Sequence, residues 1–348
     1  MKNDYKALKL IVTSSPHIRS SENTRSIMLD VIIALLPASG FAIWLFGLQA
    51  LVVMAVSVIG CVAFEWLYRH FMKQPQMVGD LSAVVTGLLL ALVCPVSIPL
   101  WTLLIGDFFA IVVVKQLFGG IGKNFVNPAL AGRAFLVGSY AGSMTTWIYP
   151  NGGKFPLFGT AADIVTGASY NGVDVMTGST PMAYLAANDV ASMHYSVADL
   201  FIGTIGGSMG EVSALMLLIG GAYLLWRKVI TWHIPVAYLG SVAVLALVFN
   251  RGNDPIEWML LNLFGGGVML GAIFMATDYA TSPISKTGQL VFGIGCGVFT
   301  VFIRYFGALN EGVCYSIMVM NLLVPLIDAH IRPTRFGVVK AKKEGAAK

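Results

Sequence analysis

Long apolar stretches alternate with short polar ones along most of the chain, and each apolar stretch has about the length of a membrane-spanning helix. A helix that crosses the hydrocarbon core needs about 20 mainly apolar residues, because each residue advances it by about 1.5 Å. By this criterion the sequence predicts ten transmembrane helices, over residues 26–46, 48–68, 80–96, 99–118, 125–142, 209–226, 229–249, 258–276, 288–304 and 311–328. We therefore expect an all-α integral membrane protein.

The fifth predicted span is the least regular of the ten. Residues 125–142 contain Asn127, Pro128 and Arg133 together with several glycines. A re-entrant or broken segment is the alternative. In that case every later loop would change sides, and the basic C-terminal tail would lie outside the cell, against the charge pattern described below.

Five predicted spans precede a long polar stretch and five follow it, so the two halves are expected to have opposite orientations. An inverted 5+5 repeat would place functional sites where helices are interrupted by Gly or Pro. The glycine-rich runs at 203–210 and 265–267 are candidates for such interruptions. The predicted divisions are an N-terminal tail (1–25), a first membrane half (26–142), an outer segment with a re-entrant approach (143–208), a second membrane half (209–328) and a basic tail (329–348).

Composition excludes a soluble globular protein. Charged residues make up 11% of the 348 residues and apolar residues 57%, whereas soluble domains carry roughly 25% charged residues.

The cysteines lie far apart within apolar stretches, which favours small buried side chains over disulfides or metal ligands. The histidines show no metal-ligand spacing. These cysteines are Cys61, Cys94, Cys296 and Cys314.

The basic residues fall mainly on one side of the predicted topology. With both tails in the cytoplasm, 18 of the 22 Lys and Arg residues face inward, as the positive-inside rule requires. Only Lys154, Arg251 and Arg304 face outward, and Arg133 lies within a span. We therefore expect a multi-pass membrane protein with both termini cytoplasmic and the long polar segment outside.

The outer segment contains a short motif, Asp-Val-Met-Thr-Gly-Ser-Thr-Pro-Met, over residues 174–182. Considered alone, it describes a turn before a helix. Gly178 allows backbone conformations closed to other residues, Ser179 or Thr180 can cap a helix, and Pro181 suits the first helical position.

A covalently attached flavin is the functional alternative for this motif. Thr180 would supply the hydroxyl for a phosphoester with flavin mononucleotide (FMN), while Thr177, Gly178 and Ser179 would form the surrounding turn. Asp174 would help to position a metal or the donor pyrophosphate during attachment. A neighbouring element has nearly the same layout but ends in Ser169, so the residues alone leave two acceptors open.

Further motifs run from one end of the chain to the other. They are Ser-Ser-Pro-His-Ile-Arg-Ser (14–20), Gly-Gly-Ile-Gly-Lys-Asn-Phe-Val-Asn-Pro-Ala (119–129), Thr-Trp-His-Ile-Pro-Val (231–236), Met-Ala-Thr-Asp (275–278) and Leu-Val-Pro-Leu-Ile-Asp (323–328). With these motifs the chain resembles the RnfD subunits of Rnf electron-transport complexes. That family is related to the NqrB subunit of sodium-pumping NADH:quinone oxidoreductase.

The resemblance implies a membrane electron-relay subunit with covalent FMN on Thr180. Val175 and Ser179 replace a glycine and an alanine of the family's usual motif, but the acceptor and Gly178 are present. The family's complexes transfer electrons between ferredoxin and NAD⁺ and move Na⁺ or H⁺ outward. The implied partners are the other Rnf subunits, including a periplasmic flavoprotein and iron–sulfur subunits. Because this chain has no dinucleotide-binding fingerprint, those subunits would handle NAD.

The resemblance to NqrB also implies a noncovalent riboflavin toward the inner side. Its ligands would be Asn124 and Asn127, with Asp278 as a third. An asparagine side chain both donates and accepts hydrogen bonds, as the uracil-like edge of a flavin requires. The alternative is that the two asparagines cap and brace a broken helix around Pro128.

Asp107 lies near the middle of the fourth predicted span. An ionisable group within the membrane is a candidate for an ion route because its burial is costly, although such groups also pair with one another. We therefore expect Asp107 to belong to a cation or proton pathway. Two other functions remain open: a component of an NADH:quinone oxidoreductase, and a solute channel or transporter without redox chemistry.

Overall fold

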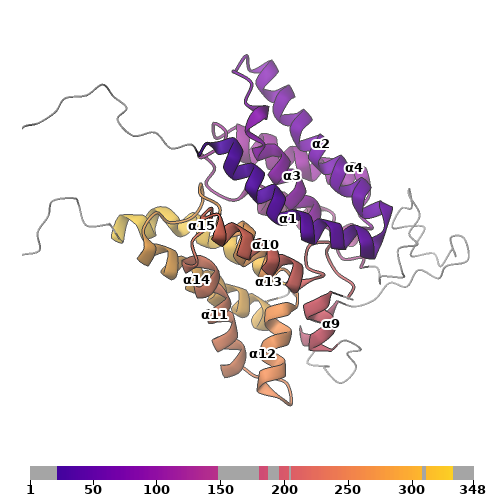
Figure 1. Ribbon diagram of the computed structural model, residues 1–348, viewed down its shortest axis with the longest axis vertical. Coiled ribbons are helices and arrows are strands. Elements are labelled where there is room, and N and C mark those ends of the chain that lie inside the picture. The colour runs from indigo at the N-terminus through magenta and orange to yellow at the C-terminus, as the bar shows by residue number, and fades with distance from the viewer. Residues whose placement is uncertain (1–21, 148–179, 187–195, 204, 308–310, 332–348) are drawn as a thin grey trace, which may run out of the picture.

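The computed structural model describes residues 22–147, 180–186, 196–203, 205–307 and 311–331, and this part of the chain is all helical (Figure 1). The N-terminal half comprises α1 (Thr24–Phe46), α2 (Leu48–Phe71), the short 3-10 helix η2 (Val78–Asp80), α3 (Ser82–Leu92), α4 (Leu100–Phe108), the π-helix η3 (Phe109–Gln116), α5 (Pro128–Ser139) and α6 (Ala141–Met144). The C-terminal half comprises α8 (Pro181–Ala186), α9 (Val197–Ile202), α10 (Ala214–Trp226), α11 (His233–Val248), α12 (Pro255–Phe264), α13 (Val268–Leu270), the π-helix η5 (Gly271–Met275), α14 (Lys286–Phe306) and α15 (Val313–His330).

Among the described residues, four helices are long and apolar enough to cross a membrane: α1, α2, α14 and α15. A fifth such segment joins α12 to α13 and η5 through a bend of 62°. The prediction of an all-α, multi-pass membrane protein is therefore confirmed. The count of ten crossings stays a prediction, because α3 has 11 residues and would advance only about 17 Å.

The outer surfaces of the long helices are apolar. Large exposed side chains include Trp44 on α1, Ile59 on α2 and Phe302 on α14. Soluble monomers rarely expose large continuous apolar patches, whereas lipid tails accept such side chains. These surfaces therefore suit a protein surrounded by lipid.

Several helices begin at residues that satisfy their free N–H groups. The side chains of Asn23, Asn127 and Asp254 accept backbone hydrogen bonds from the first turns of α1, α5 and α12. Pro128 and Pro255 occupy the first positions of two of these helices, where a missing N–H costs nothing. Local sequence thus fixes where these helices start.

Both glycine-rich interruptions are present. Gly203 ends α9 with a φ of 113°, and residues 205–213 reach α10 without forming a helix. In this segment the Gly210 N–H donates to the carbonyl of Leu92 at the end of α3, at 2.7 Å. A side chain at Gly210 would lie 2.9 Å from the Leu92 Cβ atom, so glycine permits this approach. The second interruption, at 265–267, produces the bend before α13.

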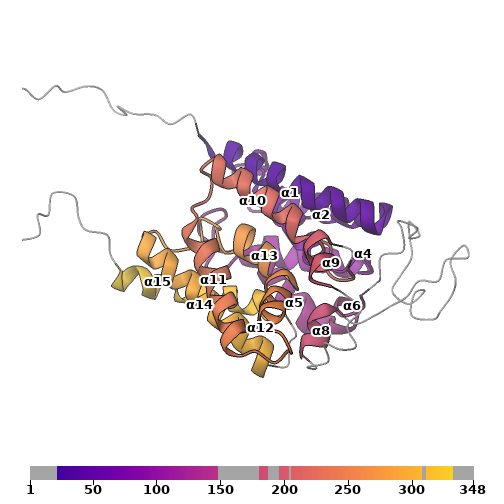
Figure 2. The same ribbon diagram turned by 60° about the horizontal axis from the view of Figure 1, so that its bottom comes forward.

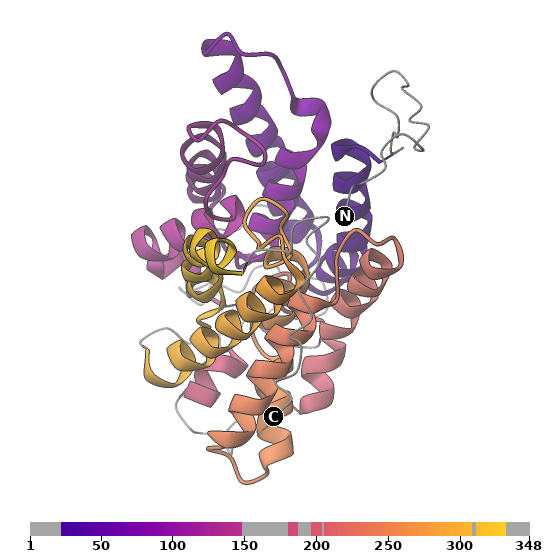
Figure 3. The ribbon, with the colours of Figure 1, turned by 90° about the vertical axis from the view of Figure 1, so that its left-hand side faces the viewer.

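The two halves are connected by helix packing as well as by the chain. In Figure 2, α10 of the second half lies along α1 of the first, and these helices are in contact. Within the second half, α11 packs on α14. Figures 1 and 3 show α2 and α12 at opposite ends of the molecule, so the interior between them is built by both halves.

Candidate functional site

Thr180 lies at the start of α8 and is 7% exposed. Figure 2 shows α8 close to α5 and α6. Thr180 lines a pocket of about 160 Å³ together with Arg133, Val137, Met144, Thr145, Trp147, Glu311, Gly312, Cys314 and Tyr315. The other residues predicted for this site, Asp174, Thr177, Gly178 and Ser179, and the alternative acceptor Ser169 lie outside the described residues.

Arg133 is the charged centre of this pocket. Its guanidinium forms an ion pair with Glu311, and its Nη2 atom lies 3.6 Å from Oε1 of Glu211. The Nε atom of Arg133 is buried and has no hydrogen-bond partner within the described part of the chain. The lining of this pocket thus includes an arginine with an unused hydrogen-bond donor, and a guanidinium is a group that suits the phosphate of an attached FMN.

This charge cluster lies where the interruption before α13 meets α5 and α15. A side chain at Gly267 would approach Oε1 of Glu211 at 3.2 Å. Arg304 donates hydrogen bonds to the carbonyls of Asn262 and Gly265, at 2.7 and 3.0 Å. The second arginine thus satisfies carbonyl groups that the bent helix leaves without helical partners.

A second cavity, of about 100 Å³, brings together the three residues predicted to hold riboflavin. Asn124, Asn127 and Asp278 line it from segments about 150 positions apart in the sequence. Lys115 and Ser82 lie on its wall as well, and α1 and α10 contribute apolar side chains. The cavity thus belongs to both halves of the protein.

The three predicted residues have different surroundings. The Oδ1 atom of Asn127 accepts the backbone N–H of Ala129 at 3.0 Å, and its Nδ2 atom donates to the carbonyl of Met275 at 3.3 Å. Asn127 therefore has the capping and bracing role that the sequence left as an alternative. By contrast, Oδ1 of Asn124 is buried and has no hydrogen-bond partner among the described residues, so it is available to a ligand.

Asp278 uses both carboxyl oxygens locally. They accept hydrogen bonds from the backbone N–H of Ala280, at 3.4 Å, and from the hydroxyl of Thr281, at 3.2 Å. Burial raises the pKa of the Asp278 carboxyl above its ordinary value, although these two hydrogen bonds act in the opposite direction. Asp278 thus shapes the rim of the cavity through the turn that it stabilises.

Asp107 is fully buried and lines neither cavity. Its Oδ1 atom accepts hydrogen bonds from Ser57 Oγ at 2.6 Å and from Cys61 Sγ at 3.3 Å. The Oδ2 atom has no partner in the described structure. Its place in an ion route stays a prediction. In the same part of the chain, no group of three His, Cys, Asp or Glu residues could hold a metal ion.

Lys115 also lines the second cavity, which no sequence motif indicated. It is 2% exposed and donates hydrogen bonds to Glu65 and Ser82, at 2.8 and 2.6 Å. A charged residue inside the apolar stretch 99–118 was the available signal. Its partners lie 50 and 33 positions earlier, and only the tertiary structure brings them together.

Known proteins resemble this chain over almost its full length. One belongs to the Na⁺-translocating ferredoxin:NAD⁺ oxidoreductase complex of Acetobacterium woodii, in which it is the component designated D. It is 48% identical over 342 residues, which cover 98% of this chain and 99% of the relative. Its counterpart in the proton-translocating ferredoxin:NAD⁺ oxidoreductase complex of Clostridium ljungdahlii is 37% identical, with 94% of this chain and 96% of the relative covered.

A further relative is the component with the same designation in the ion-translocating oxidoreductase complex of Stutzerimonas stutzeri. It is 37% identical over 335 residues, covering 92% of this chain and 93% of the relative. Residues 11–337 match the family described as NQR2, RnfD, RnfE. The expectation drawn from the sequence motifs is therefore confirmed: the chain belongs to the NQR2, RnfD, RnfE family.

Proposed function

We propose that this chain is the RnfD component of an ion-translocating ferredoxin:NAD⁺ oxidoreductase complex and relays electrons within the membrane through FMN bound to Thr180. The names of the relatives support the assignment to such a complex. The observation that carries the flavin assignment is that the buried Thr180 lines one pocket together with Arg133, whose Nε atom is unpartnered. The other subunits of the complex are the partners.

Four residues of this pocket have separate roles in holding the flavin. Thr180 bears the phosphoester, and Arg133 donates a hydrogen bond to a phosphate oxygen, which gives a charge-assisted contact. Trp147 and Tyr315 supply aromatic wall next to the attachment point. A bound flavin provides one- and two-electron chemistry, while the protein fixes its position and its electrostatic surroundings.

The charge distribution supports an orientation for the relay. With both termini in the cytoplasm, the segment that leads to Thr180 faces the outside, and the cavity around Asn124 faces inward. Electrons from cytoplasmic donors would reach the outer flavin through the membrane.

A noncovalent riboflavin in the cavity around Asn124 is the second part of the proposal. The unpartnered Oδ1 atom of Asn124 would accept the N–H of the uracil-like edge of the ring. Asn127 and Asp278 would hold the backbone around the ring in place through the hydrogen bonds described above.

The covalent attachment is tested by in-gel flavin fluorescence of the denatured protein, expressed together with a flavin-attaching enzyme. We expect a fluorescent band in the wild type and in Ser169→Ala, and loss of that band in Thr180→Val, which removes the hydroxyl but keeps the size. A dark wild-type band, or a band that survives in Thr180→Val and disappears in Ser169→Ala, would show that Thr180 is not the acceptor.

The reaction of the intact complex separates the proposed function from the two alternatives. We expect reduction of NAD⁺ with reduced ferredoxin, coupled to ion movement into or out of vesicles. Quinone reduction by NADH would instead indicate NqrB-like activity, and solute transport without electron transfer would indicate a channel or transporter. Since the relatives named above include both a Na⁺- and a H⁺-translocating complex, ion replacement in the same assay identifies the coupling ion.

A further inference from the structure

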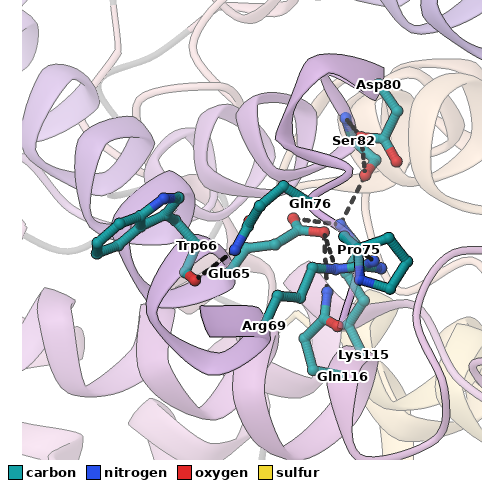
Figure 4. Close-up of polar contacts among 9 residues, drawn as sticks. All are labelled: Glu65, Trp66, Arg69, Pro75, Gln76, Asp80, Ser82, Lys115 and Gln116. Atoms are coloured by element: carbon teal, nitrogen blue, oxygen red, sulfur yellow. Dashed lines mark hydrogen bonds and ion pairs between the residues drawn. The ribbon is translucent and has the colours of Figure 1, made fainter. Parts of the chain in front are cut away.

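A buried lysine stands beside the cavity that contains Asn124. Lys115 belongs to the π-helix η3, and its ammonium group donates to Oε2 of Glu65 at 2.8 Å and to Oγ of Ser82 at 2.6 Å. Figure 4 shows both contacts and the surrounding residues. Lys115 and Ser82 line the cavity, whereas Glu65 lies behind them and is fully buried.

The hydrogen-bond directions make Lys115 a donor, and its ion pair with the Glu65 carboxylate is that of an ammonium group. A serine hydroxyl has one hydrogen, and that of Ser82 is directed to Oδ1 of Asp80 at 2.6 Å. Ser82 therefore accepts the hydrogen bond from Lys115. An ammonium group has three N–H donors. Glu65 and Ser82 accept two of them, so one N–H of Lys115 remains without an acceptor.

Lys115 and Arg69 carry one more charge than the Glu65 carboxylate that they share, and the Asp278 carboxylate on the cavity wall also attracts Lys115. Oε1 of Glu65 accepts a hydrogen bond from Gln116 at 2.8 Å and lies 3.6 Å from Nε of Arg69. One buried carboxylate is thus shared by Lys115 and Arg69. Asp80 carries a further negative charge but is only partly buried, so solvent screens it more strongly.

Most other polar side chains on the cavity wall are satisfied within the protein. The hydroxyls of Thr86, Thr277 and Tyr279 donate to the carbonyls of Ser82, Ile273 and Val229. Asn127 and Asp278 are occupied as described above. What remains in this part of the structure is the third N–H of Lys115, a charged donor, and the side-chain amide of Asn124, whose Oδ1 atom is an unpartnered acceptor.

We propose that Lys115 and Asn124 together bind the imide edge of a flavin in this cavity and that the Lys115 ammonium stabilises the reduced ring. This inference rests on the proposed riboflavin site. A flavin's imide edge presents a carbonyl, an N–H and a second carbonyl in sequence. Asn124 accepts the N–H, and Lys115 donates to the carbonyl next to ring nitrogen N1.

The charge of Lys115 favours electron uptake by the ring. An electron that arrives from the complex's own electron donor without a proton adds one negative charge, and the same electron later leaves for the next carrier. Lys115 keeps its proton throughout and forms no bond. Because opposite charges attract more strongly in the low dielectric of a buried site than in water, the ammonium raises the midpoint potential of the bound flavin.

The test is a redox titration of the noncovalent flavin in the purified complex. We expect Lys115→Met to lower the midpoint potential and Glu65→Gln, which removes the opposing buried charge, to raise it. The midpoint potential in Lys115→Arg should stay closer to that of the wild type than the potential in Lys115→Met.

Lys123→Met is the matched control, since Lys123 is exposed and does not line the cavity. A tenfold change in the reduction equilibrium corresponds to about 59 mV for one electron.

The outcomes separate this inference from the proposal on which it rests. Absence of noncovalent riboflavin from the wild-type complex overturns the riboflavin site itself. Riboflavin with the same potential in wild type, Lys115→Met and Glu65→Gln overturns the role of Lys115 alone. If Lys115→Met fails to assemble, as judged by size-exclusion chromatography of the complex, the Glu65→Gln variant provides the test. A raised potential in Glu65→Gln supports the role of Lys115, and an unchanged or lowered one overturns it.

Discussion

One buried arginine holds two carboxyl groups from distant segments in place. Arg133 comes from α5, Glu311 from the residues just before α15, and Glu211 from the segment that leads to α10. Removal of one partner from a buried ion pair costs more than the pair itself contributes, because a charge is then left without compensation. Arg133 therefore has structural importance apart from any contact with a cofactor.

Replacement of Arg133 by methionine should lower the free energy of unfolding by about 3–5 kcal/mol. The matched control is Arg251→Met: Arg251 is exposed and its guanidinium lies 4.5 Å from the centre of the Tyr305 ring. A contact of that kind contributes about 0.5–1 kcal/mol. The measurement is the apparent melting temperature of the purified complex in detergent. Equal shifts for the two variants would contradict the assigned role of Arg133.

Some residues of the two cavities could be predicted from sequence motifs, but Lys115, Arg133 and the contacts that they make could not. Asn124, Asn127 and Asp278 do line one cavity. Their motifs do not reveal that Asn127 uses its hydrogen bonds at the helix start while Asn124 keeps a free oxygen. That difference depends on how α5 meets Met275, a contact across 148 positions of sequence.

The crossing of α1 and α10 depends on one small residue. Gly220 of α10 lies against α1, and a methyl group on its Cα atom would collide with the carbonyl oxygen of Ala34 and come within 3.0 Å of the Phe274 ring. Small residues allow helix backbones to approach closely in membrane proteins. This crossing joins the two halves, and residues from both helices line the cavity that contains Lys115.

Gly220→Ala should therefore separate α1 from α10 and destabilise the protein by about 1–3 kcal/mol, the usual cost of overpacking. Gly240→Ala on α11 is the matched control, because nothing lies within 4 Å of the position its methyl group would occupy. Melting of the complex in detergent reports both variants. A Gly220→Ala variant as stable as Gly240→Ala would mean that the helices do not approach this closely.

Helix positions follow from the apolar pattern more reliably than helix lengths. Every predicted span contains a helix, yet in the span predicted over residues 80–96 the α-helix runs only from Ser82 to Leu92. Beyond it, the backbone of Cys94 accepts a hydrogen bond from Met209 in the other half. The π-helices η3 and η5 were also unforeseen, because segments of 8 and 5 residues are too short to show a period of their own.

The two halves depend on one another because the Lys115 cavity is formed only where they meet.

The ten-span topology can be tested with single cysteines, since the four native cysteines are all buried. Gln74 and Asn253 are exposed positions in connecting segments, after α2 and after α11. In the ten-span topology they lie on opposite sides of the membrane.

We expect a membrane-impermeant maleimide added to intact cells to label Asn253→Cys at once, and Gln74→Cys only after the membrane is permeabilised. The charge distribution places the segment after α2 inside and the segment after α11 outside. The parent protein, which has only its buried cysteines, gives the background. Labelling of both variants from the same side would exclude the ten-span topology.

Helix α5 sets the spacing between the two cavities. Pro128 at its start lines the cavity with Asn124, and Val137 near its end lines the pocket with Thr180. The nine helical steps between them advance about 14 Å, less than half the roughly 30 Å thickness of the hydrocarbon core. Even if α5 stood upright in the bilayer, two flavins placed at its ends would span only part of the insulating layer. With the two proposed flavins at these positions, an electron that crosses the whole membrane would need at least one more carrier.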